Sequence, residues 1–360
     1  MKKTIIDLFE SSVAKYGDKD FLLEKHDGVF QPTSYKLTRE LALKVGAGLA
    51  AIGVKPKQTV SILAEGCNNW IISELGLLYA GAISVPLSIK LEEANDLTFR
   101  LKHSDAKLIF VSHHQLRKVR NIIAELPEVK HVVVWGDAEG GLREGEISLE
   151  DLEARGEAYL ADNREAFMAI GQALQNDDIA TITYTSGTTA DPKGVILTHR
   201  NYTANVEQAL TRISIPADYT MFIILPLDHC FAHVAGFYIM VACGASVATT
   251  QVGRTPMETL KNVPINIKEV KPHFILSVPS LAKTFKKNIE SNIKKKGAMT
   301  ERLFHWGMAI NQCYYGDSNL DFKGLRLFLK PLVWFFDKII FSKVRENFGG
   351  ELRFFIGGGA

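Results

Sequence analysis

Cysteine is scarce in this sequence, and neither charge sign is in clear excess. The four cysteines, Cys67, Cys230, Cys243 and Cys313, form no C-x-x-C pair. This spacing argues against a zinc site and favours free, mostly buried thiols in a reducing compartment. The formal net charge of +2 predicts no general attraction to nucleic acid or to acidic membranes.

No secretory signal is predicted either, because Asp7 and Glu10 interrupt the N-terminal segment. Residues 230–253 contain no Lys, Arg, Asp or Glu, and this length would be enough to cross a bilayer. Gly244, however, divides the stretch into a helix-like half and a β-rich half, and polar residues such as His233 lie within it. We therefore predict a buried helix, a turn and a buried strand in place of a membrane span.

What the sequence does have is a repeated βα rhythm over 360 residues, a length that suggests two or more packed units. Short apolar runs that indicate strands alternate with helical patterns, and Asn68 or Asn69 is expected to cap one helix. A parallel, doubly wound α/β sheet covered on both faces is therefore predicted. The first series has expected strands at 59–64, 83–87, 107–112 and 131–135 and expected helices at 68–80, 92–103 and 115–126.

A second series follows a region of different composition. Residues 136–177 are rich in Gly, Glu, Asp and Arg, and they predict a surface excursion with some helix. No internal repeat or low-complexity linker separates the two series. The second has expected strands at 221–225, 245–251, 274–278 and 352–356 and expected helices at 201–211, 231–242, 257–263, from 280 onward and at 331–348.

The most informative stretch is residues 184–194, Y-T-S-G-T-T-A-D-P-K-G. Its glycines, four hydroxyl side chains and one lysine offer the donors that a polyphosphate needs. The Walker pattern G-x-x-x-x-G-K-[ST] does not fit, because Gly187 stands six residues before Lys193 and Gly194 follows it. The next residues are apolar and β-branched, so we expect a hairpin loop that binds phosphate. A solvated Ser/Thr/Gly turn is the alternative.

This stretch resembles the phosphate loop of the adenylate-forming superfamily, which carries Y-T-S-G-T-T-G-x-P-K-G. Ala190 departs from the pattern, where glycine is usual. The run from Val195 through His199 to Asn201 is similar to the family's continuation, and residues 225–229, L-P-L-D-H, resemble its L-P-x-x-H motif. The resemblance covers essentially the whole sequence and implies the family's large N-terminal domain. It divides approximately into a first βα unit with the phosphate loop at 58–204 and a second with the acyl pocket at 205–360 plus about 30–57.

The resemblance also implies roles for single residues. Lys193, Thr185 and His229 are the implied catalytic residues. The implied nucleotide-binding residues are Thr185, Ser186, Gly187, Thr188, Thr189, Lys193, Gly194, Gly357, Gly358, Gly359 and Ala360. The implied acyl pocket is formed by His229, Phe231, Gly236, Val278 and Pro279. A capped core histidine at His229 and a simple strand terminus at Pro279 are the alternatives.

ATP with Mg²⁺ and CoA as co-substrate are the implied cofactors. No metal ligand is predicted in this sequence, and the main Mg²⁺ ligand is expected outside it. A zinc pair of His229 and His233 lacks a third ligand and the usual glutamate. Family members continue for a further 150 to 250 residues with a β-subdomain and a small mobile domain that holds a catalytic lysine. We therefore expect a truncated or inactive portion, a pseudoenzyme or a frameshifted gene, with little ligase activity of its own.

The run Leu276–Trp306 resembles the long-chain fatty acyl branch of the family. That branch has a basic insertion before a stretch similar to Leu303-Phe304-His305-Trp306. Here the basic stretch from Lys283 to Arg302 either forms a solvated helix face or attracts CoA phosphates or an anionic membrane. The aromatic-rich run 328–341 is a separate feature, for which core packing and membrane docking are both open.

The resulting hypothesis is an AMP-forming fatty acid–CoA ligase that activates a long-chain acid. A non-catalytic nucleotide- or acyl-binding pseudoenzyme and an acyl-acyl carrier protein synthetase are the alternatives. An unrelated P-loop NTPase fails on the loop spacing. The expected partners are a fatty acid, ATP and CoA, with no nucleic acid, while a homodimer and peripheral membrane contact stay open. The expected location is the cytoplasm, with peripheral membrane association left open.

Overall fold

The computed structural model describes residues 4–185, 192–277, 279–315 and 323–358, without the side chains of 277–281 and 316–327. The chain divides into two compact units, Met1–Asn262 and Val263–Ala360. The predicted division near residue 204 concerns the two βα series and stays a prediction. Each compact unit is considered by itself below.

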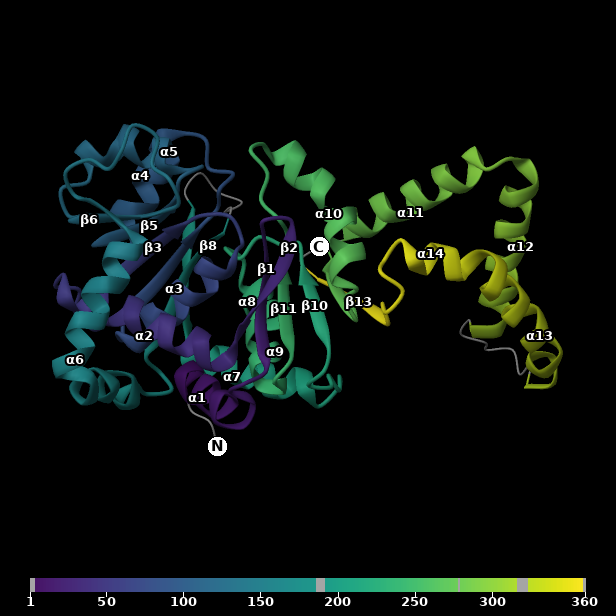
Figure 1. The fold of residues 1–360 in the computed structure, drawn as a ribbon, viewed down its shortest axis with the longest axis horizontal. Coiled ribbons are helices and arrows are strands. Elements are labelled where there is room, and N and C mark those ends of the chain that lie inside the picture. Colours follow the sequence, from purple (N-terminus) through teal and green to yellow (C-terminus); the bar gives the residue numbers. More distant parts are fainter. Residues whose placement is uncertain (1–3, 186–191, 278, 316–322, 359–360) are drawn as a thin grey trace. The chain divides into compact units, whose positions relative to one another are not determined.

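A seven-stranded sheet dominates the first unit (Figure 1). Its strand order is β7-β6-β5-β3-β4-β8-β9, and every neighbouring pair is parallel except the antiparallel β8 and β9. β4 lies on one side of β3 and β5 on the other, which confirms the doubly wound parallel sheet. The strands are β3 Thr59–Leu63, β4 Ile83–Leu87, β5 Leu108–Ser112, β6 His131–Trp135, β7 Glu146–Ser148, β8 Ile179–Thr185 and β9 Lys193–Thr198.

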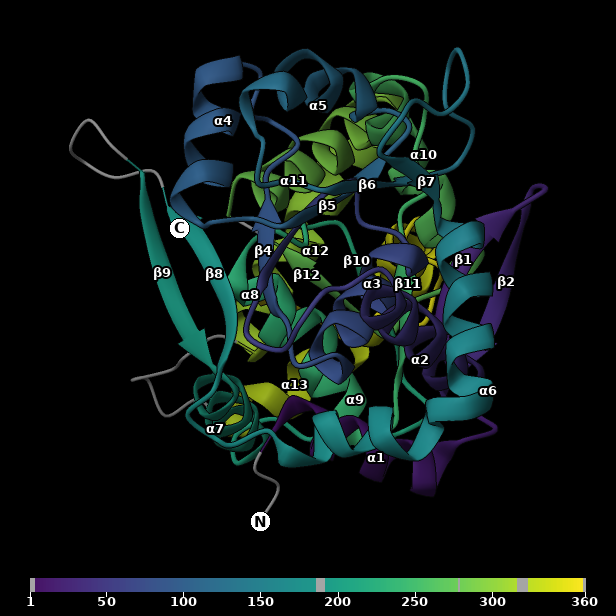
Figure 2. The same ribbon diagram turned by 90° about the vertical axis from the view of Figure 1, so that its left-hand side faces the viewer.

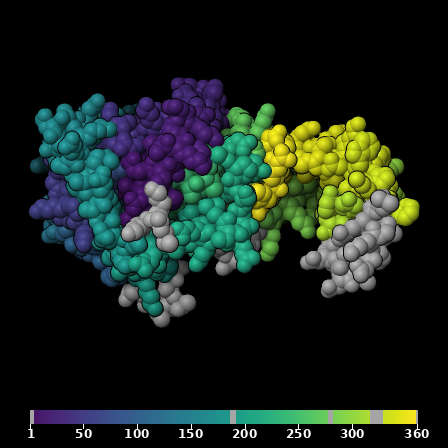
Figure 3. Space-filling view, turned by 90° about the horizontal axis from the view of Figure 1, so that it is seen from below, coloured from purple at the N-terminus to yellow at the C-terminus, as the bar shows by residue number. Residues whose placement is uncertain are grey.

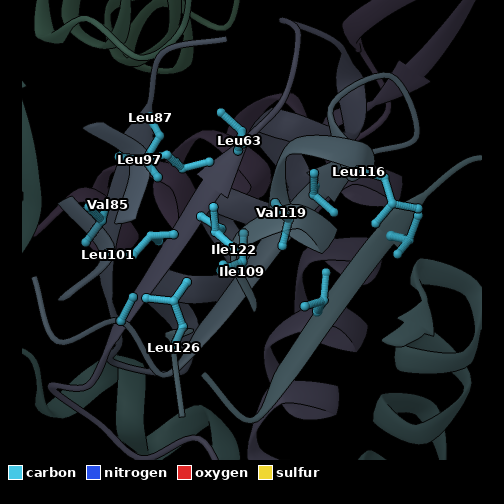
Figure 4. Close-up of a cluster of buried hydrophobic side chains, with 14 residues drawn as sticks. Leu63, Val85, Leu87, Leu97, Leu101, Ile109, Leu116, Val119, Ile122 and Leu126 are labelled. Carbon is cyan, nitrogen blue, oxygen red and sulfur yellow. The ribbon is translucent and has the colours of Figure 1, made fainter. Parts of the chain in front are cut away.

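One face of this sheet is covered by α4, Ala94–His103, and α5, Leu116–Ile122, which a 3₁₀ turn extends over Ile123–Glu125. Figure 4 shows the apolar side chains that fill the layer between these helices and the strands. Leu97 and Leu101 stand one turn apart on α4, so a single helix face enters the core. The sequence periodicity predicted both helices to within a few residues.

The opposite face is covered by α2, Tyr35–Ala51, α3, Asn68–Tyr79, and α6, Leu149–Ala173. Nearly every residue of α3 is buried, because this helix contacts β4 of the seven-stranded sheet and β1 of a second sheet. The predicted asparagine cap of α3 is wrong. Cys67 occupies the N-cap position, and the Asn68 backbone N–H instead donates to Glu24 Oε2 at 2.9 Å. A carboxylate from another strand thus replaces a local cap.

Residues 136–177 are more ordered than the sequence predicted. α6 is 25 residues long, with a kink at Asn163, and it buries Leu152, Leu160 and Phe167. A Cβ atom at Gly156 would overlap the Lys44 carbonyl oxygen, so glycine allows α6 to pack closely on α2. The charged composition that indicated a surface excursion belongs to the solvent-facing side of this helix.

The second sheet of this unit has the order β10-β11-β1-β2, with β2 antiparallel to β1. Residues 230–253 form a helix, a turn and a strand, as predicted, and Gly244 ends the helical part with a φ of 70°. No helix among the described residues is long and apolar enough to cross a membrane. The strands are β1 Asp20–His26, β2 Val29–Ser34, β10 Thr220–Ile223 and β11 Ser246–Thr249. The helices are α1 Ile5–Tyr16 (purple in Figure 3), α7 His199–Leu210, α8 Cys230–His233, a π-helical turn Val234–Tyr238 and α9 Ile239–Cys243. α10, Pro256–Val270, contains the boundary between the two units.

In the second unit, β12, Phe274–Ser277, pairs in parallel with β13, Phe354–Gly357. Four apolar side chains, Ile293, Phe304, Phe336 and Ile340, form a small cluster between its helices. Pro331 lies inside a helix that begins at Lys323, so it does not start the last helix as the sequence suggested. The helices are α11 Pro279–Lys295, α12 Ala298–Tyr315, α13 Lys323–Phe336, a π-helical turn Asp337–Phe341 and α14 Ser342–Glu346.

The cysteines are less buried than predicted. Cys313 is exposed, and the other three are half-buried thiols.

Candidate functional site

The predicted phosphate loop joins two antiparallel strands, as its sequence indicated. β8 and β9 pair from Ile179↔Thr198 to Thr185↔Lys193 (Figure 2). The register places exposed Thr185 opposite exposed Lys193, at the end of the hairpin where the loop begins. A hydroxyl and a cation therefore stand at the entrance to the loop. The predicted phosphate ligands Ser186, Gly187, Thr188 and Thr189 lie outside the described residues.

Gly194 has a packing role in this hairpin. It pairs with Tyr184, and a Cβ atom at Gly194 would lie 3.0 Å from Ile182 Cγ2 and 3.5 Å from the Tyr184 ring. Glycine thus lets the aromatic ring lie across the strand next to Lys193.

Tyr184 anchors the loop end of β8 to α4. Its hydroxyl donates to the Arg100 carbonyl at 3.2 Å and lies 2.8 Å from His103 Nδ1. Since the hydroxyl has one proton, both bonds form together when His103 Nδ1 carries a proton and donates. The Arg100 guanidinium also lies 5.8 Å from the centroid of the Tyr184 ring. Burial raises the pKa of this phenol, so it stays neutral and keeps its donor.

A second anchor holds the middle of β8. The Thr181 hydroxyl is 2.7 Å from the Tyr202 hydroxyl on α7, which is 3.1 Å from His233 Nδ1 on α8. We call Thr181, Tyr202 and His233 the buried polar chain, because all three side chains are buried. Burial lowers the pKa of His233 to about 3, and the His229 imidazole acts in the same direction. The imidazole is therefore neutral at pH 7.

His229 lies one helical turn before His233 but has a different environment. It is exposed and is the N-cap of α8, where its Nδ1 accepts a hydrogen bond from the Phe231 backbone N–H at 3.1 Å. The buried polar chain, in contrast, connects the last residue of α8, His233, with β8. Phe231 is half-buried on the same helix, and Gly236 is buried in the π-helical turn that follows.

His199 connects the other end of the hairpin to the N-terminal helix. It is buried at the start of α7, and its Nδ1 accepts a hydrogen bond from the Ile5 backbone N–H at 3.3 Å. Burial lowers the pKa of His199 to about 4, and the nearby Asp178 and Asp7 carboxylates oppose this shift. A capping box between Thr198 and Asn201 fixes the turn from β9 into α7.

A buried carboxyl group lies close to the buried polar chain. Glu74 on α3 is fully buried, and the Tyr238 hydroxyl is 3.4 Å from its Oε1. The ring centroids of Tyr238 and Tyr202 are 5.1 Å apart, so Tyr238 links Glu74 to the buried polar chain. Burial raises the pKa of Glu74 to about 7, and its Oε2 makes no hydrogen bond to a described residue.

The remaining predicted residues belong to the second unit. Gly357 ends β13, where it is exposed and pairs with Ser277 at the end of β12. Gly358 follows half-buried, and Pro279 begins α11. The C-terminal ends of these two parallel strands therefore lie side by side within this unit, and the predicted nucleotide-binding residues Gly357 and Gly358 stand at that edge. Val278, Gly359 and Ala360 lie outside the described residues.

Sequence reasoning missed the anchors of the hairpin. The motif identifies Tyr184 but not its bonds to α4, and the sequence indicates for His233 a metal ligand or a polar residue in an apolar stretch, but not a hydrogen-bond partner of Tyr202. Tyr202 was not singled out at all, because a single tyrosine in a helical pattern gives no signal of a partner on another helix. Among the described residues, no group of three or more His, Cys, Asp and Glu side chains is arranged to hold a metal ion.

This chain is similar to known proteins in sequence and in fold. The family described as AMP-binding enzyme matches residues 9–360. Among curated proteins, a chloroplastic long-chain-fatty-acid–acyl-carrier-protein ligase of Arabidopsis thaliana is 24% identical over 99% of this chain and 52% of its own length. The peroxisomal long chain acyl-CoA synthetase 7 of the same plant is 27% identical over 99% of this chain and 49% of its own. The chain thus spans about half the length of these relatives.

The fold is also found in solved structures. The anthranilate CoA ligase AuaEII, solved with anthranoyl-AMP, has a TM-score of 0.65 at 22% identity and covers 77% of this chain and 50% of its own. A long-chain-fatty-acid-CoA ligase from Archaeoglobus fulgidus has a TM-score of 0.64 at 20% identity and covers 81% of this chain and 54% of its own.

Proposed function

Because the chain belongs to the AMP-binding enzyme family, we propose that it is the nucleotide-binding portion of an AMP-forming fatty acid–CoA ligase. In the first half-reaction, a carboxylate oxygen attacks the α-phosphorus of ATP, and the bond to the bridging oxygen breaks to release pyrophosphate. In the second, the CoA thiolate attacks the acyl carbon and AMP leaves. A long-chain acid is the proposed substrate, in line with the names of several relatives at 24–27% identity.

The observation that carries this proposal is the placement of Lys193 and Thr185 on facing strands at the entrance to the loop. A carboxylate is a weak nucleophile, so catalysis depends on positioning and on neutralising the charge of the leaving pyrophosphate. Lys193 is an exposed cation at that position, and Thr185 adds a hydroxyl donor. We assign both to the β- and γ-phosphates, together with the loop residues between them.

His229 is the proposed residue on the acyl side. Its Nδ1 is used as a helix cap, which orients the ring at the end of the L-P-L-D-H run. Phe231, Gly236, Val278 and Pro279 are the other proposed pocket residues. ATP is proposed to bind with Mg²⁺, which offsets phosphate charge, and Gly357 to Ala360 are proposed to border the adenine.

The test is pyrophosphate binding by the 360-residue chain, measured by titration calorimetry. We expect Lys193→Ala to weaken the affinity about 100-fold, since a charge-assisted contact to phosphate is lost. Lys36→Ala is the matched control, because Lys36 is another exposed lysine of the first unit and its removal changes the net charge equally. Equal effects of the two substitutions would contradict the assigned site.

The reaction itself is tested by acid-dependent ATP–pyrophosphate exchange with a full-length gene product that contains this chain. Acids of graded chain length would identify the substrate, and CoA and an acyl carrier protein would be compared as acceptors. Exchange that needs a fatty acid is the expected result. ATP hydrolysis without any acid, abolished by Lys193→Ala, would instead indicate an NTPase.

A further inference from the structure

Two helices of the second unit expose large apolar side chains. On α13, Phe328 is 77% exposed and Trp334 63%, and on α12, Met299 is 72% exposed and Trp306 64%. Leu332 and Phe335 on α13 are also exposed. We call these six residues the apolar helix surface. Single exposed apolar residues are common, but six on two adjacent helices are unusual for a surface that faces only water.

The spacing along α13 separates this surface from the core. Phe328, Leu332 and Phe335 follow one another at intervals of four and three residues, so they lie along one side of the helix. Phe336 and Ile340 lie on a different side and pack in the cluster with Ile293 and Phe304. The internal core of the unit therefore uses one stripe of the segment and leaves a second apolar stripe uncovered.

The second unit as a whole, which carries this surface, is strongly positive. Residues 263–360 contain 16 Lys and Arg against 8 Asp and Glu, a formal charge of +8, whereas the first unit has 26 against 32, a charge of −6. The lysines of α11 are exposed at positions 283, 286, 287, 294 and 295, and Lys296 follows. Lys338 Nζ lies 5.1 Å from the centroid of the Trp334 ring, so a cation and an exposed indole occupy the same site.

We propose that the apolar helix surface docks on an anionic lipid bilayer, with α12 and α13 lying in the plane of the membrane interface. Exposed Trp, Phe and Leu enter the boundary between headgroups and acyl chains, while flanking lysines remain with the anionic headgroups. A second copy of this chain fits the surface less well, since a symmetric dimer would bring two units of charge +8 together. Nucleic acid would use the lysines but would not need the aliphatic and aromatic stripe.

The experiment is vesicle flotation of the full 360-residue chain without nucleotide or acid, so its outcome is independent of the proposed ligase activity. Vesicles of phosphatidylcholine alone are compared with vesicles that contain about 30% phosphatidylglycerol, at about 50 mM and about 500 mM salt. We expect at least tenfold stronger partitioning to the anionic vesicles, and most of that gain should disappear at the higher salt.

Substitutions separate the apolar contribution from the charge. Phe328→Gln with Leu332→Gln should reduce partitioning at least tenfold, while Met257→Gln, at a residue of the first unit that is 67% exposed, should leave it unchanged. Circular dichroism shows whether the glutamine double variant keeps its helices. If it does not, Phe328→Leu still tests the proposal, because this conservative variant keeps an apolar side chain and should bind like wild type.

Four results would overturn the proposal. The first is no preference for anionic vesicles, and the second is equal binding by the glutamine double variant when its helicity is intact. The third is a dimer in light scattering that the same double substitution dissociates, because the surface would then bind a second copy. The fourth is salt-sensitive binding to DNA that the double substitution does not change. It would show that only the lysines bind a partner, and it would contradict bilayer docking.

Discussion

The two strands of the hairpin, β8 and β9, have opposite environments although they pair with each other. β8 lies between β4 and β9, and its Thr181 and Tyr184 are each tied by side-chain hydrogen bonds to a helix. β9 is the last strand of the sheet, where Val195 is 41% exposed and Ile196 56%. We call β8 with its two side-chain anchors the buried frame, whereas β9 presents Lys193 to solvent.

This difference separates stability from binding. Substitutions in β8, or among the buried polar residues near it, remove buried hydrogen bonds and change the electrostatics of the core. We therefore expect them to alter the free energy of unfolding. Substitutions on β9 change groups that water already contacts, so we expect them to act on ligand affinity alone. The predictions that follow test this division, from the largest expected effect to the smallest.

Glu74→Gln should give the largest effect, and the effect should depend on pH. The pKa of Glu74 is about 7 in the folded protein against an ordinary value of 4.5, so the penalty of burying this group is absent below pH 4.5 and grows as the pH rises to 7. The free energy of unfolding of the variant, relative to wild type, should therefore increase by about 3 kcal/mol between pH 4.5 and pH 8.

Urea unfolding at both pH values measures this change. A difference between variant and wild type that does not vary with pH would contradict the buried, neutral carboxyl. Glu157→Gln, at an exposed glutamate on α6 that pairs with Lys44 at 3.0 Å, is the control, and it should change the free energy of unfolding by less than about 1 kcal/mol.

His233→Gln should reduce the loss of stability in acid by about 2 kcal/mol between pH 7 and pH 5. The pKa of His233 is about 3 in the folded protein, against an ordinary value of 6.5. The stability that depends on this neutral imidazole is therefore present above pH 6.5 and is lost as the pH falls. Glutamine does not titrate, so the variant lacks this part of the loss. An unchanged pH profile would mean that the imidazole is not buried beside Tyr202.

Tyr184→Phe should lower the free energy of unfolding by about 1 kcal/mol, because it removes the hydrogen bonds to Arg100 and His103 and keeps the ring. Thermal unfolding measures the stability, and calorimetry measures pyrophosphate affinity. A loss of pyrophosphate affinity of more than about tenfold would contradict the separation of stability from binding, because β8 and its anchors would then also set the position of the loop.

Ile196→Thr should change the free energy of unfolding by less than about 0.5 kcal/mol, because the side chain is already more than half exposed. Denaturant unfolding provides the measurement. A loss above about 2 kcal/mol would show that β9 is covered by a part of the chain or by a partner, and would remove the contrast between the two strands.

Most of the fold of the first unit could be predicted from the sequence, because its elements have strong local patterns. Apolar runs such as 131–135 indicated strands that are buried on both faces. The phosphate motif predicted the hairpin, whose pairing from Ile179 to Thr198 is confirmed. The roles of Lys193, Thr185 and His229 stay predictions.

The features that escaped prediction depend on contacts between distant segments. The N-terminus of α3 binds Glu24, which stands 44 residues earlier, and a local search for capping residues cannot find such a partner. α6 has a mixed composition because only one side of it packs on α2. The hydrogen bonds that connect Thr181 to His233 join three elements, β8, α7 and α8. The residue pattern of a single element therefore cannot predict them.

The four tryptophans are divided evenly between the two units. Trp70, whose ring lies 5.2 Å from that of His233, and Trp135 are buried in the first unit, whereas Trp306 and Trp334 are exposed in the second. Their fluorescence therefore contains two signals that acrylamide can separate, because the quencher reaches only the exposed pair. An emission band that is blue-shifted and protected reports on the core of the first unit, and a red-shifted, quenched band reports on the apolar helix surface. The two regions can thus be followed in one cuvette without any added label.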